Sequence, residues 1–488
     1  MQIRGRYEVP QLVEQPSGAP LSGKKSTLSL LILFFTCFAI NSDQLASAPN
    51  LTLISQTFRL TLAERDSHLG ALIQFGFYVS AGIFSILSGP LIEFIDRSKL
   101  LGAVAAISGT LSCCSGLVPG GRAGFFYFFL IRISTGVSVG ITLPTAFSLL
   151  GDMIPVNKRT TMGALVTTSS AGGAAIGQAI AGLSGGAWRL PFFISSFLSF
   201  TACFLCLFVL SDPRASGNLG EARKSPTLKN AAAHAWQRDG KSLSSLGRST
   251  MSIEDLNWSK FQNVLRVSTN RHIFAQSIPG CIAWSSIATF MPDFLHRDIG
   301  FTVKGSTGVM AVFGIGGLVC ALVGSGIGQA IYNRHRRNLP AFVALCIAAG
   351  AVPMVLLSLF GGKGFLTVLL ALLGGVAASA GPNFKGMLMN ANPSSDRGSV
   401  FAMFNLVDNL GKGLGPSVLV MVTWLVGGSR RFAFAIAFSL WFVSAWVALQ
   451  LENCLNEDTL AVEIKQGGTE ETREPFDLLH IYHGEEVK

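Results

Sequence analysis

Charged residues are scarce in this chain. Only 13 % of its 488 residues are Asp, Glu, Lys or Arg, and 49 % are apolar, whereas a soluble domain carries about 25 % charged residues. The apolar residues form long runs, and ~20 of them in a helix cross a bilayer core of about 30 Å. Unbroken runs predict spanning helices, because the strands of a membrane barrel would alternate apolar and polar residues.

Patterns for metal binding, catalysis and ATP use are missing. Among the nine cysteines and seven histidines, Cys203 and Cys206 have the spacing of metal ligands, but no second pair accompanies them. Structural metal sites need such a second pair. No phosphate-binding loop is present. We therefore expect no metal, no cofactor and no enzymatic activity. The net charge of +10 is explained by basic cytoplasmic loops, so nucleic acid is not an expected partner.

Two sets of six apolar runs flank a polar middle segment. The fold class expected is an all-α membrane protein with twelve transmembrane helices in two six-helix repeats. The spans of the first half, residues 27–211, are expected at 27–48, 67–91, 100–118, 124–150, 160–184 and 190–211. Those of the second half, residues 272–450, are expected at 272–294, 305–331, 339–360, 365–388, 398–427 and 431–450. The remaining segments are an N-terminal tail (1–26), a basic linker (212–271) and an acidic tail (451–488).

The two halves share prolines, glycines and polar loop residues at corresponding positions. Six residues of the first half have counterparts at a constant offset of 238 positions: Pro144, Asp152, Pro155, Arg159, Gly173 and Gly177 match Pro382, Asn390, Pro393, Arg397, Gly411 and Gly415. A fixed offset of this kind indicates an internal repeat. The glycines lie one helical turn apart, a spacing that favours close packing between membrane helices.

Basic residues gather in loops on one side of the predicted bundle. This side holds the linker and also Arg97, Lys99, Lys158, Arg159, Arg334, Arg336, Arg337 and Arg397. Since cytoplasmic loops are enriched in Lys and Arg, we expect both termini and the linker in the cytoplasm. Glu474, Leu478 and Leu479 match an acidic dileucine sorting pattern, so the endolysosomal or vacuolar membrane is an alternative to the plasma membrane.

Between spans two and three, Gly89 is followed by the acidic Glu93 and the basic Arg97; span four holds Arg132 with Gly136 and Gly140, and span five holds the glycines from Gly173 to Gly182. These three motifs resemble the cytoplasmic loop motif, the fourth-helix motif and the fifth-helix motif of the major facilitator superfamily, and the resemblance covers roughly residues 27–450. Asn41 and Asp43 in span one look most like Spinster-like lipid transporters, although Gln44 and Val139 replace residues of that group. The resemblance implies a secondary transporter that alternates access, with Gly89, Glu93, Arg97, Asp152, Arg159 and Arg397 as a conformational switch.

Asp43 and Arg132 are expected to meet inside the membrane. Asp43 lies about 24 Å into a helix that starts at the cytoplasm, and Arg132 about 12 Å into one that starts outside, at 1.5 Å per residue. The two side chains would share one depth in a core of about 30 Å. A charge there is costly and is a functional candidate by default. Two interpretations stay open, a proton-coupling site and a static pair that orients the helices.

Asp408 and Lys412 form a second candidate group, one turn apart near the middle of span eleven. Transporter sites lie near that depth, so the two residues are candidates for anchoring a polar or zwitterionic substrate. The alternative is an intrahelical pair that serves packing. Further substrate-binding candidates are Asn41, Gln44 and Asn383. Lys385 is expected near the inner face, where its stem could snorkel toward water.

The function expected is secondary active or facilitative transport of a small organic solute or a lysolipid by alternating access, with proton coupling through Asp43 and Arg132 as an open question. The protein would be a monomer that contacts membrane lipids. The alternative is a receptor or sensor that keeps the transporter fold without transport.

Overall fold

The computed structural model describes residues 23–154, 156–212, 258–393 and 396–467. The N-terminal tail up to residue 22, most of the linker and the dileucine residues Glu474, Leu478 and Leu479 lie outside these ranges. Within them all regular secondary structure is helical. The first half contains α1 (Gly23–Asn41), α2 (Leu51–Thr57), α3 (Leu62–Glu64), α4 (Ile73–Phe94), α5 (Arg97–Leu117), α6 (Arg122–Met153), α7 (Val156–Leu183) and α8 (Leu190–Phe208).

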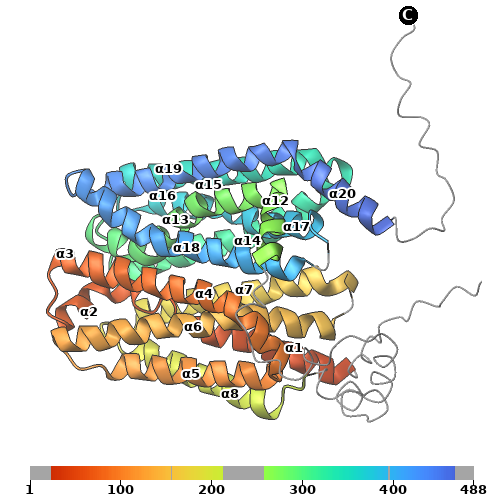
Figure 1. The fold of residues 1–488 in the computed structure, drawn as a ribbon. Helices are drawn as coiled ribbons and strands as arrows, with labels where there is room; N and C mark the ends of the chain where they lie inside the picture. The colour runs from red at the N-terminus through yellow and green to blue at the C-terminus, as the bar shows by residue number, and fades with distance from the viewer. Residues whose placement is uncertain (1–22, 155, 213–257, 394–395, 468–488) are drawn as a thin grey trace, which may run out of the picture.

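The second half repeats this order. It contains α13 (Ser268–Arg297), α14 (Val303–Arg334), α15 (Leu339–Phe360), α16 (Phe365–Gly374), α17 (Ala380–Asn390), α18 (Arg397–Leu425) and α19 (Arg430–Leu449), flanked by α12 (Trp258–Arg266) and α20 (Leu455–Gly467). In Figure 1 the helices of the first half lie below those of the second, and the axes of the long helices are roughly parallel.

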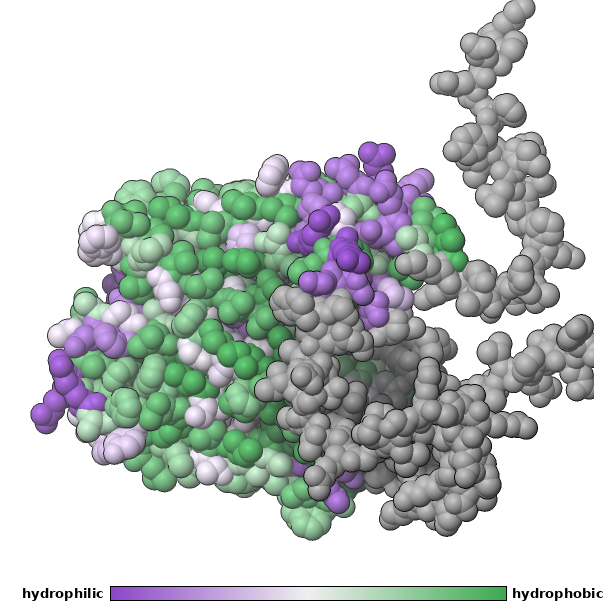
Figure 2. Space-filling model, viewed as in Figure 1, coloured by the Kyte–Doolittle hydropathy of each residue, from purple (hydrophilic) through white to green (hydrophobic). Residues whose placement is uncertain are grey.

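The helices have the length and surface of membrane spans. Among the described residues, nine helices are long and apolar enough to cross a bilayer. Three more, α1, α7 and α18, lie at the other expected positions, which is consistent with twelve. Hydrophobic side chains cover the flank of the bundle, while hydrophilic ones gather at its two ends (Figure 2). The predicted fold class, an all-α multi-pass membrane protein, is confirmed.

The two ends of the bundle differ. We call the end where α1 begins and α20 lies the tail end, and the opposite end, where α2 and α3 lie, the distal end (Figure 1). At the distal end of the first half, four buried aromatic rings pack together. Phe58 lies 5.5 Å from Phe128 and 6.0 Å from Trp188 between ring centroids, and Phe128 lies 5.9 Å from Phe192. Aromatic rings in edge or tilted contact stabilise the fold by more than the burial of their apolar surface alone.

Span one is broken where the sequence predicted a continuous helix over 27–48. The helix α1 ends at Asn41, and the chain continues through i to i−3 bonds, in which Gln44 N donates to Asn41 O at 3.1 Å and Ala46 N to Asp43 O at 3.2 Å. The Asn41 amide donates to Cys37 O at 2.8 Å and the Ser42 hydroxyl to Ala39 O at 2.7 Å. Such side chains compete with the backbone ladder, and they account for the change to 3₁₀ turns.

Span ten is interrupted as well. Its halves, α16 and α17, are joined by a 3₁₀ segment over Gly375–Ser379. A Cβ on Gly375 would lie 2.5 Å from the backbone nitrogen of Gly317 on α14, and one on Gly350 would lie 2.7 Å from Ala377. The backbones of α14, α15 and this segment therefore approach too closely for larger residues.

The repeated glycines pack helices in the same way in both halves. A Cβ on Gly173 or Gly177 would collide with the carbonyl oxygen of Phe38 or Ser42, respectively, on span one. In the second half, Gly415 faces Ile282 O at 2.5 Å and Gly411 faces Ile278 Cα at 3.2 Å. In each half the two contacted residues lie four apart on the partner helix. The predicted close contact is thus present between α1 and α7 and between α13 and α18.

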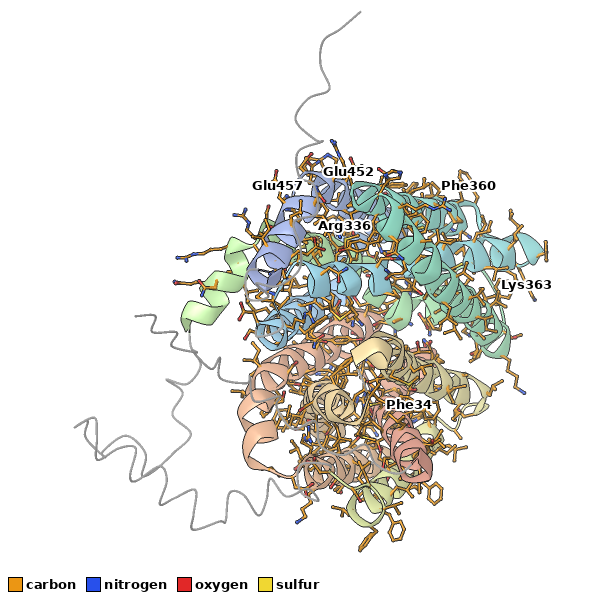
Figure 3. The ribbon with its side chains drawn as sticks, turned by 90° about the vertical axis from the view of Figure 1, so that its right-hand side faces the viewer. Phe34, Arg336, Phe360, Lys363, Glu452 and Glu457 are labelled. Carbon is orange, nitrogen blue, oxygen red and sulfur yellow. The ribbon has the colours of Figure 1, made fainter. Side chains whose placement is uncertain are left out.

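Two helices outside the spans cover the tail end of the second half. Asp458 on α20 accepts a hydrogen bond from Thr269 N at 2.7 Å, at the start of α13. Arg336 Nη2 lies 2.8 Å from Glu463 Oε1 on the same helix, and Figure 3 shows Arg336 beside α20. On α12, Val264 is buried and its carbonyl accepts from the Asn270 amide at 2.9 Å. The last part of the linker and the first part of the acidic tail are therefore packed elements.

Adjacent glycines on α7 give a matched test of this packing. We expect Gly173→Ala to lower stability by about 1–3 kcal/mol, because its new methyl group meets the Phe38 carbonyl. Gly172 has open space at its Cβ position, so Gly172→Ala should be neutral or gain up to about 1 kcal/mol from helix propensity. Thermal unfolding of both variants in detergent measures the difference. Equal melting temperatures would contradict the packing role.

Candidate functional site

A buried ion pair joins spans one and four, as expected from the similar depths of Asp43 and Arg132 in the membrane. Arg132 Nη1 lies 2.9 Å from Asp43 Oδ2, and the two side chains are 1 % and 2 % exposed. Arg132 Nη2 also donates to Asp43 O at 3.1 Å and to Gln44 O at 3.4 Å. These carbonyls belong to the broken part of span one. Arg132 therefore neutralises the carboxylate and also donates to two carbonyls of the break, of which Asp43 O in addition accepts from Ala46 N at 3.2 Å.

The surroundings of this ion pair are partly aromatic and partly polar. Phe77 and Phe192 flank the guanidinium, with their ring centroids 5.7 Å and 5.5 Å from Arg132 Cζ. The Ser112 hydroxyl donates to Asp43 Oδ2. Asp43 Oδ1 and Arg132 Nε are buried without a hydrogen-bond partner among the described residues. Buried polar atoms without partners are rare and call for a functional or solvent explanation.

A second polar group lies where the halves meet. Lys412 Nζ lies 2.6 Å from Asp408 Oδ2, and Cys281 Sγ donates to Asp408 Oδ1 at 2.9 Å. The helix α18 that carries the pair also packs on α4 of the first half, where a Cβ on Gly413 would lie 3.4 Å from Tyr78 Cβ. Asp408 and Lys412 keep 20 % and 36 % of their side-chain surface exposed. The predicted intrahelical pair is present and accessible.

Gln44 connects the two groups. Its Nε2 donates to the Tyr78 hydroxyl at 3.0 Å, and Tyr78 packs against α18 beside Gly413, which directly follows Lys412. Gln44 directly follows Asp43, so polar side chains extend from the Asp43–Arg132 pair across α4 to the second half. Asn41 does not join them, because its amide is bonded to Cys37 O of its own helix.

The candidate Asn383 on α17 does not join this group. The Asn383 amide donates to Gly324 O at 3.1 Å and to Ser379 O at 2.8 Å, which ties span ten to α14. Lys385, which was expected near the inner face, lies five residues before the end of α17 at Asn390 and is partly exposed. The structure thus brings together Gln44, Asp408 and Lys412 and adds Tyr78, while Asn41 and Asn383 bond to backbone elsewhere.

The predicted switch residues lie at the tail end. Arg97 forms a buried ion pair with Asp212, its Nε donating to Asp212 Oδ2 at 2.9 Å, and its Nη1 donates to Ser148 O at 2.9 Å. Arg397 Nε donates to Met389 O at 3.0 Å, which joins the end of α17 to the start of α18. Gly89 lies on α4 with open space at its Cβ position. The side chains of Glu93, Asp152 and Arg159 lie outside the part that the structure describes.

An ion-pair cluster that the sequence did not predict joins the halves at the distal end. Arg65 Nη1 of the first half lies 3.2 Å from Asp293 Oδ2 of the second, and the Thr52 hydroxyl donates to Asp293 Oδ1 at 3.1 Å. Arg65 lies in a π-helical segment, Arg65–Leu72, and is 2 % exposed. π-Helical segments occur often at functional sites.

Each half also supplies counter-ions of its own to this distal cluster. Asp66 Oδ1 lies 2.7 Å from Arg65 Nη2. Arg430 Nη1 lies 3.0 Å from Asp293 Oδ2 and 2.9 Å from Asp298 Oδ2. Burial raises the pKa of the Asp298 carboxyl, the nearby Arg430 opposes this shift, and Asp293 adds to it. The sequence did place four of these charged residues at predicted span ends, namely Arg65, Asp66, Asp293 and Arg430. It did not indicate which of them meet.

The chain matches the sequence profile of the Major Facilitator Superfamily over residues 30–416. Two uncharacterized MFS-type transporters of Bacillus subtilis are similar: YceJ is 22 % identical over 73 % of this chain and 82 % of its own length, and YwfA is 29 % identical over 34 % of this chain. The chain spans 39 % of the length of YwfA.

Solved structures share the fold at low identity. A bacterial homologue of the human lysosomal transporter Spinster, in an inward-facing and unoccupied conformation, has a TM-score of 0.67 at 14 % identity, covering 90 % of this chain and 99 % of that one. A D-xylose–proton symporter has a TM-score of 0.64 at 15 % identity, covering 88 % of this chain and 97 % of that one. At these identities the likeness concerns the fold.

Asp293 and Arg297 give a matched test of the distal cluster. Asp293 is 4 % exposed and contacts Arg65 and Arg430, whereas Arg297 is 35 % exposed and lies 3.5 Å from Asp293. We expect Asp293→Asn to cost about 1–3 kcal/mol, because it removes the anion that Arg65 and Arg430 share, while each cation keeps a second carboxylate, Asp66 or Asp298. Arg297→Gln should cost less than ~1 kcal/mol. Thermal unfolding in detergent compares the two, and a similar loss for both would mean that Asp293 is not the centre of the cluster.

Proposed function

The chain belongs to the major facilitator superfamily, and from this premise we propose that it is a secondary transporter that moves a small organic solute or a lysolipid by alternating access. The observation that carries the proposal is the polar group of Gln44, Tyr78, Asp408 and Lys412, which lies at mid-depth where the two halves meet. Transporters of this type bind their substrates at that place.

The distribution of basic loops indicates which end of the bundle faces the cytoplasm. The tail end holds the basic loops, and we propose that it faces the cytoplasm, with both termini and the linker on that side. The distal end then faces outside or into an organelle. There the Arg65–Asp293 and Thr52–Asp293 contacts hold the halves together, so we propose that they keep the outer side of the pathway closed in this conformation.

Proton coupling is proposed for Asp43. Its carboxylate is buried against Arg132 and has one oxygen without a partner among the described residues. Protonation would remove the charge that neutralises Arg132, and a nearby opposite charge is what favours the ionised form of a carboxylate. Because Gln44 follows Asp43 and bonds to Tyr78 on α4, a change at Asp43 would reach the substrate site through adjacent contacts.

The alternative function is a receptor or sensor with a transporter fold. Its candidate observation is the packing of α20 and α12 on the tail end, which would present the linker and the acidic tail to cytoplasmic partners. Purified protein in liposomes separates the two functions. A sensor would bind solute without flux across the membrane, and a transporter would show flux.

Asp43→Asn tests proton coupling. The amide keeps the shape of the carboxyl group and can accept the Ser112 hydroxyl, but it cannot carry a proton between the two sides. We expect proton-driven accumulation in liposomes to fall to the equilibrium level, while counterflow exchange of labelled substrate continues. The exchange in the same liposomes also shows that the variant is folded. Continued accumulation against a gradient would rule out Asp43 as the coupling group.

Arg65→Gln tests the proposed closure at the distal end. We expect the variant to open this side more often, so that a cysteine placed at the buried Phe290, which packs against Gly70 across the halves, reacts several-fold faster with a membrane-impermeant maleimide. The background would lack native cysteines that react with the reagent. Arg122→Gln is the control, since Arg122 pairs with Glu64 of the same half at 3.1 Å and is exposed. Equal labelling rates in both variants would argue against closure by Arg65.

A further inference from the structure

We infer that Gln178 on α7 closes the distal side of the pathway at a second level, by donating its side-chain amide to a backbone carbonyl of α13 that Pro292 deprives of its helical donor. The inference rests on the proposed function in that it takes the distal side to be closed in this conformation. It gives Gln178 a positioning role that is separate from the ion pairs around Asp293.

The carbonyl of Ala288 lacks the bond that a regular helix would give it. In an α-helix each carbonyl accepts from the backbone N–H four positions later. That position holds Pro292, which has no N–H to donate. The helix α13 nevertheless continues through it, from Ser268 to Arg297. Inside a bilayer, a backbone group that a proline frees needs another partner.

Gln178 supplies this partner from the other half of the protein. Its Nε2 donates to Ala288 O at 3.0 Å, and the residue is 7 % exposed. Figure 1 shows α7, which carries Gln178, at the border between the two halves. One turn later on α7, a Cβ on Gly182 would lie 1.8 Å from Thr307 Oγ1 on α14. The first half therefore packs tightly on the second here, and the hydrogen bond depends on that contact.

The Gln178 contact is connected to the distal cluster through α7. The Asn50 amide donates to Ala181 O at 2.9 Å, three residues after Gln178. Asn50 lies two residues before Thr52, whose hydroxyl donates to Asp293. The two sets of contacts therefore belong to one continuous surface between the halves.

Ala288 lies between the distal cluster and the central polar group. It precedes Asp293 on α13 by five residues, about 8 Å at 1.5 Å per residue. It follows Cys281, whose thiol donates to Asp408, by seven residues or about 11 Å. The halves are thus held together by ion pairs at the distal end and by an uncharged hydrogen bond nearer the middle.

An uncharged contact of this kind suits a closure that opens and closes again. In the closed state the amide and the carbonyl satisfy each other, and in the open state water in the pathway can satisfy both. Loss of the Gln178 amide would leave Ala288 O without its donor in the closed state alone. The population would then shift toward the open state, by about fivefold for one hydrogen bond.

Cysteine labelling of the full-length protein tests the inference. Thr307→Cys places a thiol at the buried contact between α14 and α7, in a background without native cysteines that react with the reagent. We expect Gln178→Leu to raise the rate of labelling by a membrane-impermeant maleimide by about fivefold or more. Gln329→Leu is the control, since Gln329 is exposed and donates to Asn333 of its own helix at 2.8 Å. An unchanged rate in Gln178→Leu, or an equal increase in the control, would overturn the inference.

A second substitution decides whether Gln178 acts through the carbonyl. Pro292→Ala restores a backbone N–H that can donate to Ala288 O within α13. We therefore expect Gln178→Leu to change the labelling rate by less than about twofold in the Pro292→Ala background, so that the two substitutions are not additive. An equal increase in both backgrounds would mean that Gln178 acts through its size, and would refute the role of the hydrogen bond.

The same pair of substitutions covers a variant that does not fold. If Gln178→Leu alone gives no monodisperse protein in detergent, Pro292→Ala should restore it, because the carbonyl then has a donor in its own helix. Failure of this rescue would contradict the inference.

Labelling needs no substrate, so its result is separate from the test of transport. Faster labelling of Gln178→Leu that Pro292→Ala suppresses, in a protein without flux in liposomes, would leave this inference standing and refute transport. Flux in liposomes together with an unchanged labelling rate of Gln178→Leu would refute the inference and leave transport standing.

Discussion

The bilayer interior offers no water to a charge or to a free backbone group, and the contact between Arg132 and the broken part of span one meets both needs. The break at Asn41 leaves the carbonyls of Asp43 and Gln44 outside a regular helix, and Arg132 donates to both. Asp43 in turn neutralises Arg132. The carboxylate and the guanidinium therefore depend on one another, since loss of either leaves the other as a buried charge without its counter-ion in a medium of low dielectric constant.

The two halves share a scaffold and differ in their charges. Glycines of α7 and α18 hold the same relation to α1 and α13, yet Leu370 stands where the repeat would place a second Arg132, and Ser170 where it would place a second Asp408. The first half has an ion pair between two helices, and the second has one within a single helix. An intrahelical pair moves with α18 as a unit, so it keeps its geometry when the halves shift. A pair between helices responds to local changes in their packing.

Apolar run lengths and the repeat were enough to predict the class of fold, because a membrane span has a fixed length and an internal repeat a fixed offset. Depth alone also predicted that Asp43 and Arg132 meet. Rotation of a helix about its axis is set by its neighbours, which is why Asn383 faces α14 rather than the central group. The break in span one accompanies local bonds from the Asn41 and Ser42 side chains to the backbone. The break in span ten and the pairing of Arg97 with Asp212 depend on close backbone approach and on tertiary contacts. The spacing of apolar residues in a single sequence does not reveal these features.

The distal cluster has the arrangement that a reversible closure requires. A buried ion pair costs about 3–5 kcal/mol when one partner is lost and the other stays buried. Here Arg65 keeps Asp66 on its own half, and Asp293 keeps Arg430. Separation of the halves would therefore break the Arg65–Asp293 and Thr52–Asp293 contacts without leaving an isolated charge on either side. Each half stays electrically balanced in both states, so the free-energy difference between them can remain small enough for ligand binding to shift the population.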